Sequence, residues 1–154
     1  MANTAQATPT TGRIQLALNV EDLEASTRFY SELFGTAPVK ERDGYVNFAI
    51  AEPPLKLILF QGGEGGTINH LGVEVPSSDG VKAAISRLEL TGMELDVEDE
   101  VTCCYATQDK VWATAPDGER WEYYTVLSDA EQMESDSCCE TSSADAEPVK
   151  AACC

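Results

Sequence analysis

The stretches IQLALNV (Ile14–Val20) and NHLGVEV (Asn69–Val75) are the part of the sequence that decides the fold. In both, Leu is followed by a small residue, a branched apolar residue, a polar residue and Val, and the two copies lie 55 residues apart. The alternation of branched apolar residues with other residues predicts a β-strand in each place. A repeat at this distance predicts that the chain consists of two similar halves.

A helix is predicted after each of these strands. Asp22 is a suitable N-cap for a helix over Leu23–Phe34, and Gly35 can end it. The residues expected on its apolar face are Leu23, Tyr30, Leu33 and Phe34. In the second half Ser77 or Ser78 can begin a helix, and its apolar residues at helical spacing are Val81, Ala84, Ile85 and Leu88.

Strand-like runs follow both helices. In the first half they are Ala37–Lys40, Tyr45–Ala51 and Leu55–Gln61. In the second half they are Glu94–Glu98, Thr102–Thr107 with Val111–Ala115, and Arg120–Leu127. Each half is therefore a βαβββ module, and a module of this size buries too little surface to be stable alone. We expect an α+β domain over residues 13–127, in which the two modules pair into one curved mixed sheet around a cleft.

The composition excludes several classes of partner. The chain has 154 residues, with 27 acidic and 10 basic side chains and a net charge of −17. Nucleic acid and anionic lipid both require clustered positive charge, so neither is expected as a partner. No apolar run approaches the roughly 20 residues that span a bilayer, and residues 1–12 do not resemble a secretory signal. We expect a soluble, cytoplasmic protein.

Residues 128–154 have the composition of a tail. This segment is rich in Ser, Ala, Asp and Glu, with seven acidic residues against one lysine. Low hydrophobicity with a net charge predicts disorder.

The six cysteines form three adjacent pairs. They are Cys103-Cys104, Cys138-Cys139 and Cys153-Cys154. Adjacent cysteines close almost no loop, so they are poor candidates for a disulfide framework. Two neighbouring thiols can instead bind one soft ion or metalloid. The alternative for Cys103-Cys104 is a pair of small core residues on a strand. Because successive side chains on a regular strand point to opposite faces, the chain must turn or bulge at this pair if both thiols are to bind one atom.

The repeat also indicates a metal site. His70, the only histidine, occupies the second position of its motif, and Gln15 occupies the same position in the other copy. If a pseudo-twofold axis relates the halves, the two side chains face each other across the cleft. Glu122, in the apolar run RWEYYTV, needs a buried partner, and a cation is a suitable one. Glu119 is the rival carboxylate, and a lone histidine is otherwise most often an ordinary hydrogen-bonded residue.

This layout resembles the vicinal oxygen chelate superfamily, which includes glyoxalases, bleomycin-resistance proteins and dioxygenases. The resemblance covers residues 14–127 and is clearest in RIQLALNVEDLEASTRFYSELFG (13–35). It implies metal ligands at Gln15, His70 and Glu122. Glyoxalase I enzymes use a fourth ligand, but LKLILF (55–60) has no carboxylate around Leu57, opposite Glu122. Open coordination positions are typical of catalytic metals, here Fe(II), with Mn(II), Ni(II) or another divalent ion as alternatives because Gln15 replaces a histidine.

Within that superfamily the chain is similar to an organoarsenical-cleaving and cadmium-induced subgroup. The segments that carry this similarity are VTCCYATQDKVW (101–112), PPLKL (53–57) and the Cys-rich tail. It implies an Fe(II)- and O2-dependent carbon–arsenic lyase of dioxygenase type, active in arsenical resistance. The expected substrates are trivalent organoarsenicals, such as methylarsenite or aromatic arsenicals, with arsenite released.

In this interpretation Cys103 and Cys104 bind the arsenic. The four remaining thiols (Cys138, Cys139, Cys153 and Cys154) either capture arsenic or cadmium for transfer inward or only scavenge metal. Two other functions stay open: a non-catalytic cadmium- or arsenite-binding resistance protein, and another enzyme of the superfamily, such as a thiol transferase or isomerase. Members of the superfamily occur as monomers or homodimers.

Overall fold

The structure, a computed structural model, describes residues 11–131. Within these residues each half of the chain follows one plan, a strand, a helix and three further strands. The elements are β1 (Arg13–Val20), α1 (Leu23–Phe34), β2 (Lys40–Arg42), β3 (Tyr45–Ile50), β4 (Leu55–Gln61), β5 (Thr67–Glu74), α2 (Ser78–Glu89), β6 (Asp96–Cys103), β7 (Ala106–Thr114) and β8 (Arg120–Asp129).

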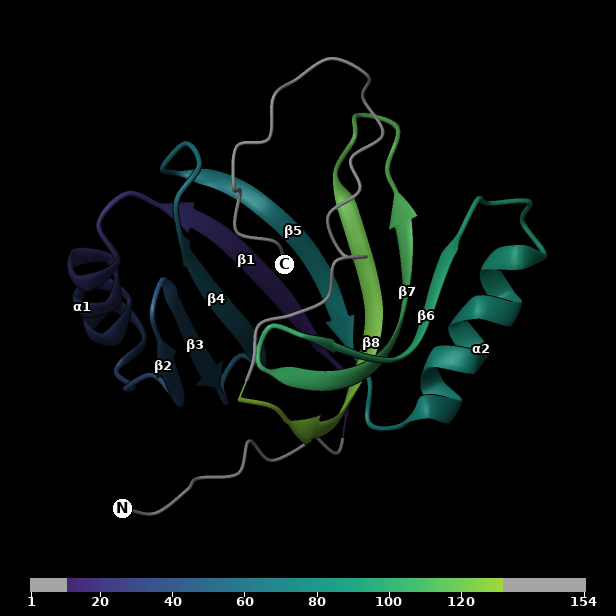
Figure 1. Cartoon of the computed structure of the whole chain (residues 1–154), viewed down its shortest axis with the longest axis horizontal. Coiled ribbons are helices and arrows are strands. Elements are labelled where there is room, and N and C mark those ends of the chain that lie inside the picture. The colour runs from purple at the N-terminus through teal and green to yellow at the C-terminus, as the bar shows by residue number, and fades with distance from the viewer. Residues whose placement is uncertain (1–10, 132–154) are drawn as a thin grey trace.

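The eight strands form one mixed sheet in the order β2-β3-β4-β1-β5-β8-β7-β6. The two modules meet where β1 and β5 pair antiparallel, and within each module the first and last strands pair in parallel. Figure 1 shows this curled sheet, with β1 and β5 side by side in the middle and α1 and α2 at opposite sides. The predicted α+β class and the two paired βαβββ modules are confirmed.

The first helix begins and ends where the sequence predicts. The Asp22 carboxylate accepts a hydrogen bond from the Ala25 amide at 2.9 Å, and Gly35 adopts the left-handed conformation with φ 62°. Leu23, Tyr30 and Phe34 pack against buried residues of β1, β3 and β4. The prediction for Leu33 is wrong, because its side chain is 59% exposed. The second helix begins after Ser77, one of the two predicted caps.

Strand limits differ from the prediction in three places. The run Ala37–Lys40 is not a strand except at its last residue, because Pro38 cannot donate a ladder hydrogen bond, and β2 covers Lys40–Arg42. The predicted run Glu94–Glu98 is the beginning of β6, which starts at Asp96. The predicted run Thr102–Thr107 covers the end of β6, the turn that follows it and the start of β7. β8 continues to Asp129, two residues beyond the expected end. Residues 132–154, most of the predicted tail with its four cysteines, lie outside the described residues.

Alternate residues of β4 face two different layers of the core. Leu57 and Leu59 belong to the buried cluster beneath α1. Ile58 and Phe60 point the other way, into a cluster that also contains Cys103 and Cys104. This inner face of the curled sheet is where the predicted site residues lie.

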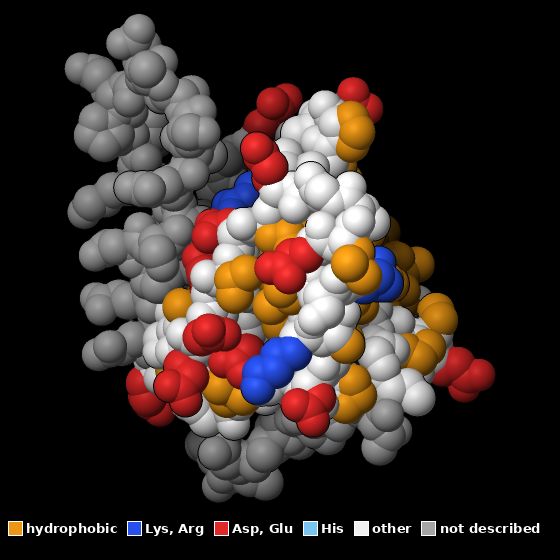
Figure 2. All heavy atoms as spheres, turned by 90° about the vertical axis from the view of Figure 1, so that its right-hand side faces the viewer, with side chains coloured by type: hydrophobic (Ala, Val, Ile, Leu, Met, Phe, Trp, Pro, Cys, Tyr) orange, Lys and Arg blue, Asp and Glu red, His pale blue; other side chains and the backbone are white. Residues whose placement is uncertain are grey.

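On one face of the domain, the charged side chains are mostly acidic (Figure 2). Figure 2, a view toward the right-hand side of Figure 1, shows more acidic than basic side chains on that face, in keeping with the net charge of −17. None of the helices between residues 11 and 131 is long and apolar enough to cross a membrane.

Candidate active site

Gln15 of β1, His70 of β5 and Glu122 of β8 meet inside the curled sheet. Gln15 Nε2 lies 3.0 Å from His70 Nε2 and donates to Glu122 Oε1 at 2.6 Å, and His70 Nε2 lies 3.3 Å from the same carboxylate oxygen. All three side chains are buried. The structure therefore brings together the three residues that the repeat pointed to. Glu119, the rival carboxylate, lies exposed in the loop before β8.

Gly72 provides the space for this convergence. It pairs with Gln15 on one side and with Glu122 on the other, so the three residues form one row across β1, β5 and β8. A Cβ atom at Gly72 would lie 3.1 Å from Glu122 Cγ and 3.3 Å from Gln15 Cβ and Nε2. In the sequence, Gly72 is recognisable only as the small residue of the repeat, and its role in the site is not apparent.

The Gln15 amide is held by Tyr124 and Glu74. The Tyr124 hydroxyl donates to Gln15 Oε1 at 2.6 Å and lies 3.2 Å from Glu74 Oε2, which also accepts from Arg13 at 2.8 Å. Burial, with the negative charge of Glu74 adding to it, raises the pKa of Tyr124 well above its usual range, so the hydroxyl stays protonated.

This arrangement allows the amide to present either end to His70 and Glu122. The oxygen and nitrogen of an amide occupy nearly equal space, and the network around them determines which end faces which partner. If Oε1 turns toward His70 and Glu122, Nε2 can donate to Tyr124, and the Tyr124 hydroxyl can donate to Glu74. Sequence reasoning missed Tyr124 and Glu74, because their contact with Gln15 depends on strand register.

The Glu122 carboxylate is the negative charge of the site. Burial alone would raise the pKa of Glu122, but the Lys110 ammonium at 3.2 Å and His70 hold it well below its usual range. Glu122 is therefore ionised at neutral pH and can act as an anionic ligand. The contact of Lys110 with Glu122 could not be read from the sequence, because it depends on the pairing of β7 with β8.

The register corrects one detail of the predicted symmetry. Gly72 of β5 pairs with Glu122, and Ala17, the residue that matches Gly72, pairs with Ile58 of β4. The residue equivalent to Glu122 is thus Ile58 and not Leu57, which faces α1. The chemical expectation is unchanged, because Ile58 supplies no fourth carboxylate.

Cys103 and Cys104 lie at a tight turn between β6 and β7. Cys104 and Tyr105 both have positive φ, 53° and 62°, as in the two-residue turns of type I′ that usually contain Asn and Gly. A left-handed residue without glycine costs about 1–2 kcal/mol. This turn brings the two sulfur atoms to within 3.2 Å of each other, in the buried cluster that also contains Ile58 and Phe60. The predicted irregularity at this pair is confirmed. Cys103 takes part in a disulfide in this structure, so the pair offers two thiols only after Cys103 is reduced.

A small cavity joins the two groups of residues. Its volume is about 10 Å³, and Gln15, Glu122 and Cys104 all line it. Across residues 11–131, no cluster of three or more His, Cys, Asp and Glu side chains is placed to hold a metal ion. His70 does not line this cavity but lies beside it, in contact with Gln15 and Glu122. A metal bound by His70 and Glu122 must therefore use the Gln15 amide as its third ligand.

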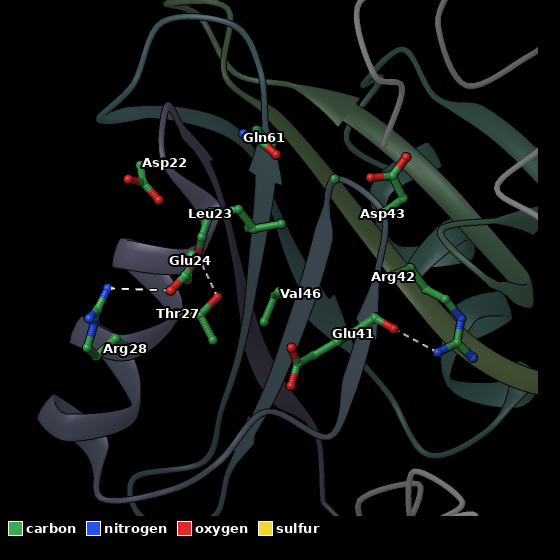
Figure 3. Close-up of a pocket in the computed structure, with 11 residues that line it drawn as sticks. Asp22, Leu23, Glu24, Thr27, Arg28, Glu41, Arg42, Asp43, Val46 and Gln61 are labelled. Atoms are coloured by element: carbon green, nitrogen blue, oxygen red, sulfur yellow. Dashed lines mark hydrogen bonds and ion pairs between the residues drawn. The ribbon is translucent and has the colours of Figure 1, made fainter.

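A larger hollow, of about 700 Å³, lies between α1 and the β2–β3 hairpin. Figure 3 shows its charged side chains, among which Arg28 lies 3.9 Å from Glu24, while Arg42 donates to the Glu41 carbonyl. Gln15, His70, Glu122 and the cysteines do not line it. Size alone therefore does not identify the reactive site of this molecule.

Comparisons with known proteins place the chain among its relatives. Residues 12–123 match the Glyoxalase/Bleomycin resistance protein/Dioxygenase superfamily. The chain is 62% identical over 120 residues to the cadmium-induced protein CadI of Mycobacterium tuberculosis, covering 77% of this chain and 79% of the relative. It is 55% identical over 132 residues to the trivalent organoarsenical cleaving enzyme of Thermomonospora curvata, covering 82% and 87%.

The fold is also found among solved structures. The homoprotocatechuate 2,3-dioxygenase of Arthrobacter globiformis superposes with a TM-score of 0.58 at 19% identity, over 84% of this chain and 40% of the dioxygenase. At this identity the likeness concerns the fold alone.

Proposed function

The chain belongs to the Glyoxalase/Bleomycin resistance protein/Dioxygenase superfamily, and on that basis we propose that it cleaves the carbon–arsenic bond of trivalent organoarsenicals and releases arsenite. The observation that carries the proposal is the shared cavity: Cys104 lines the same small space as Gln15 and Glu122. Thiolate sulfur is a ligand for soft elements, whereas amide, imidazole and carboxylate groups suit harder divalent ions. The cavity thus presents a thiol that can bind arsenic and an amide and a carboxylate that can bind a divalent cation.

The donor set fits a divalent cation. Gln15 Nε2, His70 Nε2 and Glu122 Oε1 lie between 2.6 and 3.3 Å from one another, and Glu122 is ionised. Turning the Gln15 amide gives one nitrogen and two oxygen donors, a set that leaves positions for further ligands. We propose Fe(II) on Gln15, His70 and Glu122, with Mn(II), Ni(II) or another divalent ion as alternatives. When bound there, Fe(II) supplies the binding and activation of dioxygen.

The residues of the chain bind and orient the substrate. After reduction, Cys103 and Cys104 displace the two hydroxyl groups of an arsonous acid and hold the arsenic, with the release of two waters. Ile58 and Phe60 surround the pair with apolar surface, which suits an organic substituent and excludes water. Arsenic bound to this pair would lie beside the cavity that Glu122 also lines. Well-oriented partners of this kind gain on the order of 7–11 kcal/mol in the reaction barrier.

A second function is favoured by the cadmium-induced relative, which is 62% identical to this chain. A protein that binds cadmium or arsenite through its thiols, without turnover, needs Cys103 and Cys104 but not the buried Gln15, His70 and Glu122. A His70 variant therefore distinguishes the two functions: it should abolish cleavage by the lyase, but it should leave metal or arsenite binding by the thiols intact.

The deciding experiment measures arsenite release from methylarsenite and phenylarsenite by reduced, iron-loaded protein in air. We expect His70→Ala to abolish release while arsenic still binds to the thiols, and Cys104→Ser to abolish release while iron still binds. Each variant serves as the folding control for the other. Wild-type protein that binds methylarsenite but yields no arsenite would exclude the lyase and favour the binding protein.

A further inference from the structure

Two buried amide oxygens line the cavity beside Cys104 without a hydrogen-bond partner. They are Asn47 Oδ1 of β3 and Gln108 Oε1 of β7, and neither has a partner within residues 11–131. The side chains are only 1% and 4% exposed. A buried acceptor without a partner lowers the stability of the fold by about 1–3 kcal/mol. Two such acceptors at one small cavity are unusual in a folded protein, and a ligand that donates hydrogen bonds would satisfy them.

The other polar groups around the cavity are already engaged. Asn47 Nδ2 donates to the Tyr45 hydroxyl at 3.2 Å, and Gln108 Nε2 donates to the Cys103 carbonyl at 3.3 Å, so each amide nitrogen has its own partner. Lys40, which also lines the cavity, donates to the Tyr105 carbonyl and to Asp129. Lys56, a further donor at the cavity, forms an ion pair with Glu74 at 3.8 Å. The amide oxygens of Asn47 and Gln108 are therefore left as acceptors, and the group that complements them must be a hydrogen-bond donor.

We propose that Asn47 and Gln108 form a hydroxyl-binding subsite for arsonous acids, R–As(OH)2, next to Cys104. The inference rests on the proposed function and names the form of the substrate that the site takes. A volume of about 10 Å³ admits a group the size of one water or one hydroxyl. Arsenic-bound hydroxyls are donors of that size, whereas a thiol conjugate of the same arsenical has none.

The subsite also sets the order of the two exchange steps, because Cys104 lines the cavity and Cys103 does not. In the first step the Cys104 sulfur forms a bond to arsenic, one As–O bond breaks, and the thiol proton leaves with the hydroxyl as water. The remaining As–OH donates to the amide oxygens of Asn47 and Gln108. Exchange with Cys103 then releases the second water, and arsenic stays trivalent throughout.

The test compares two forms of one arsenical with the full chain. Reduced protein under nitrogen is mixed with methylarsonous acid or with its bis-glutathione conjugate, and bound arsenic is followed over time by mass spectrometry. We expect Gln108→Met and Asn47→Leu each to slow capture of the acid about tenfold, the equivalent of one hydrogen bond, and to leave capture of the conjugate unchanged. Gln61→Met, the same kind of substitution at an exposed glutamine of β4 outside this cavity, is the control.

Thermal unfolding supplies a second measurement. Each variant removes an unpartnered acceptor, which favours folding, together with one hydrogen bond to Tyr45 or Cys103, whose loss opposes it. We therefore expect unfolding temperatures close to that of the wild type, whereas a purely structural role would lower them. Equal slowing of both arsenical forms, or no slowing of either, would overturn the subsite, and the second result would assign the cavity to water. Wild-type protein that captures neither form would instead overturn the proposed function itself.

Discussion

β4 and β8 hold matching places in the two modules, but they present opposite chemistry to the interior. Ile58 of β4 corresponds to Glu122 of β8, and Phe60 corresponds to Tyr124. β4 thus forms an apolar wall against the cysteine pair, whereas β8 supplies a carboxylate and the hydroxyl that holds Gln15. One backbone plan used twice therefore gives an asymmetric site, in which only the β8 half supplies a carboxylate.

The strongest way to break this asymmetry is Ile58→Glu, which gives β4 the carboxylate of β8. A second buried carboxylate without a cation should lower the free energy of unfolding of the metal-free protein by about 3 kcal/mol. A divalent ion should recover much of that loss, because the site then has a fourth ligand, and turnover should fall as an open position is filled. Urea unfolding with and without Mn(II) measures both effects.

Ile58→Gln is the matched control, since it has the same shape as the carboxylate variant but no charge. It should show no comparable recovery with metal. If Ile58→Glu were as stable as the wild type without metal, the proposed equivalence of Ile58 and Glu122 would be wrong.

A smaller effect is expected from Gly72→Ala. The new methyl group would press on Glu122 and Gln15 at 3.1–3.3 Å and move them apart. Changes in the surroundings of metal ligands typically cost 10–100-fold in affinity, so we expect a loss in that range, measured by titration with Fe(II) or Co(II) under nitrogen. Ala17→Gly changes the matching residue of the other module and should leave affinity nearly unchanged. Equal affinities for wild type and Gly72→Ala would show that the row across β1, β5 and β8 is not the metal site.

The smallest effect is expected from Tyr124→Phe, which makes β8 resemble β4 at Phe60. The Gln15 amide then loses the partner that lies opposite His70 and Glu122, and metal affinity should fall about tenfold. The visible spectrum of bound Co(II) should also change, because the orientation of a ligand is altered. Tyr123→Phe, on the neighbouring residue that lies near Arg87, is the control. An unchanged Co(II) spectrum in Tyr124→Phe would mean that the hydroxyl does not orient Gln15.

Much of the fold could be predicted from local patterns. The repeat at Gln15 and His70 revealed both modules, and Asp22 and Gly35 marked the ends of α1, because periodicity and caps are properties of neighbouring residues. The prediction went wrong at Ala37–Lys40, where Pro38 interrupts pairing, and at Leu33, where tertiary packing leaves part of the helix face exposed.

The candidate site was predicted in its residue types but not in its surroundings. A lone histidine, a matching glutamine and a buried carboxylate could be found because they are rare in apolar strands. The roles of Gly72 and Tyr124 could not be found, because each acts through a residue on another strand. The amide oxygens of Asn47 and Gln108, which have no partner within residues 11–131, could not be found either, because their surroundings depend on the packed sheet.

By itself, the sequence determined that two βαβββ modules exist, where their helices begin, and which side chains carry the nitrogen, oxygen and sulfur donors. Only the tertiary structure decided that Ile58 stands where a fourth carboxylate could have been and that Cys104 shares a cavity with Gln15 and Glu122. The physical reason is register: a shift of one residue between two strands turns every side chain to the other face, and pairing between distant strands is set by the packed sheet as a whole.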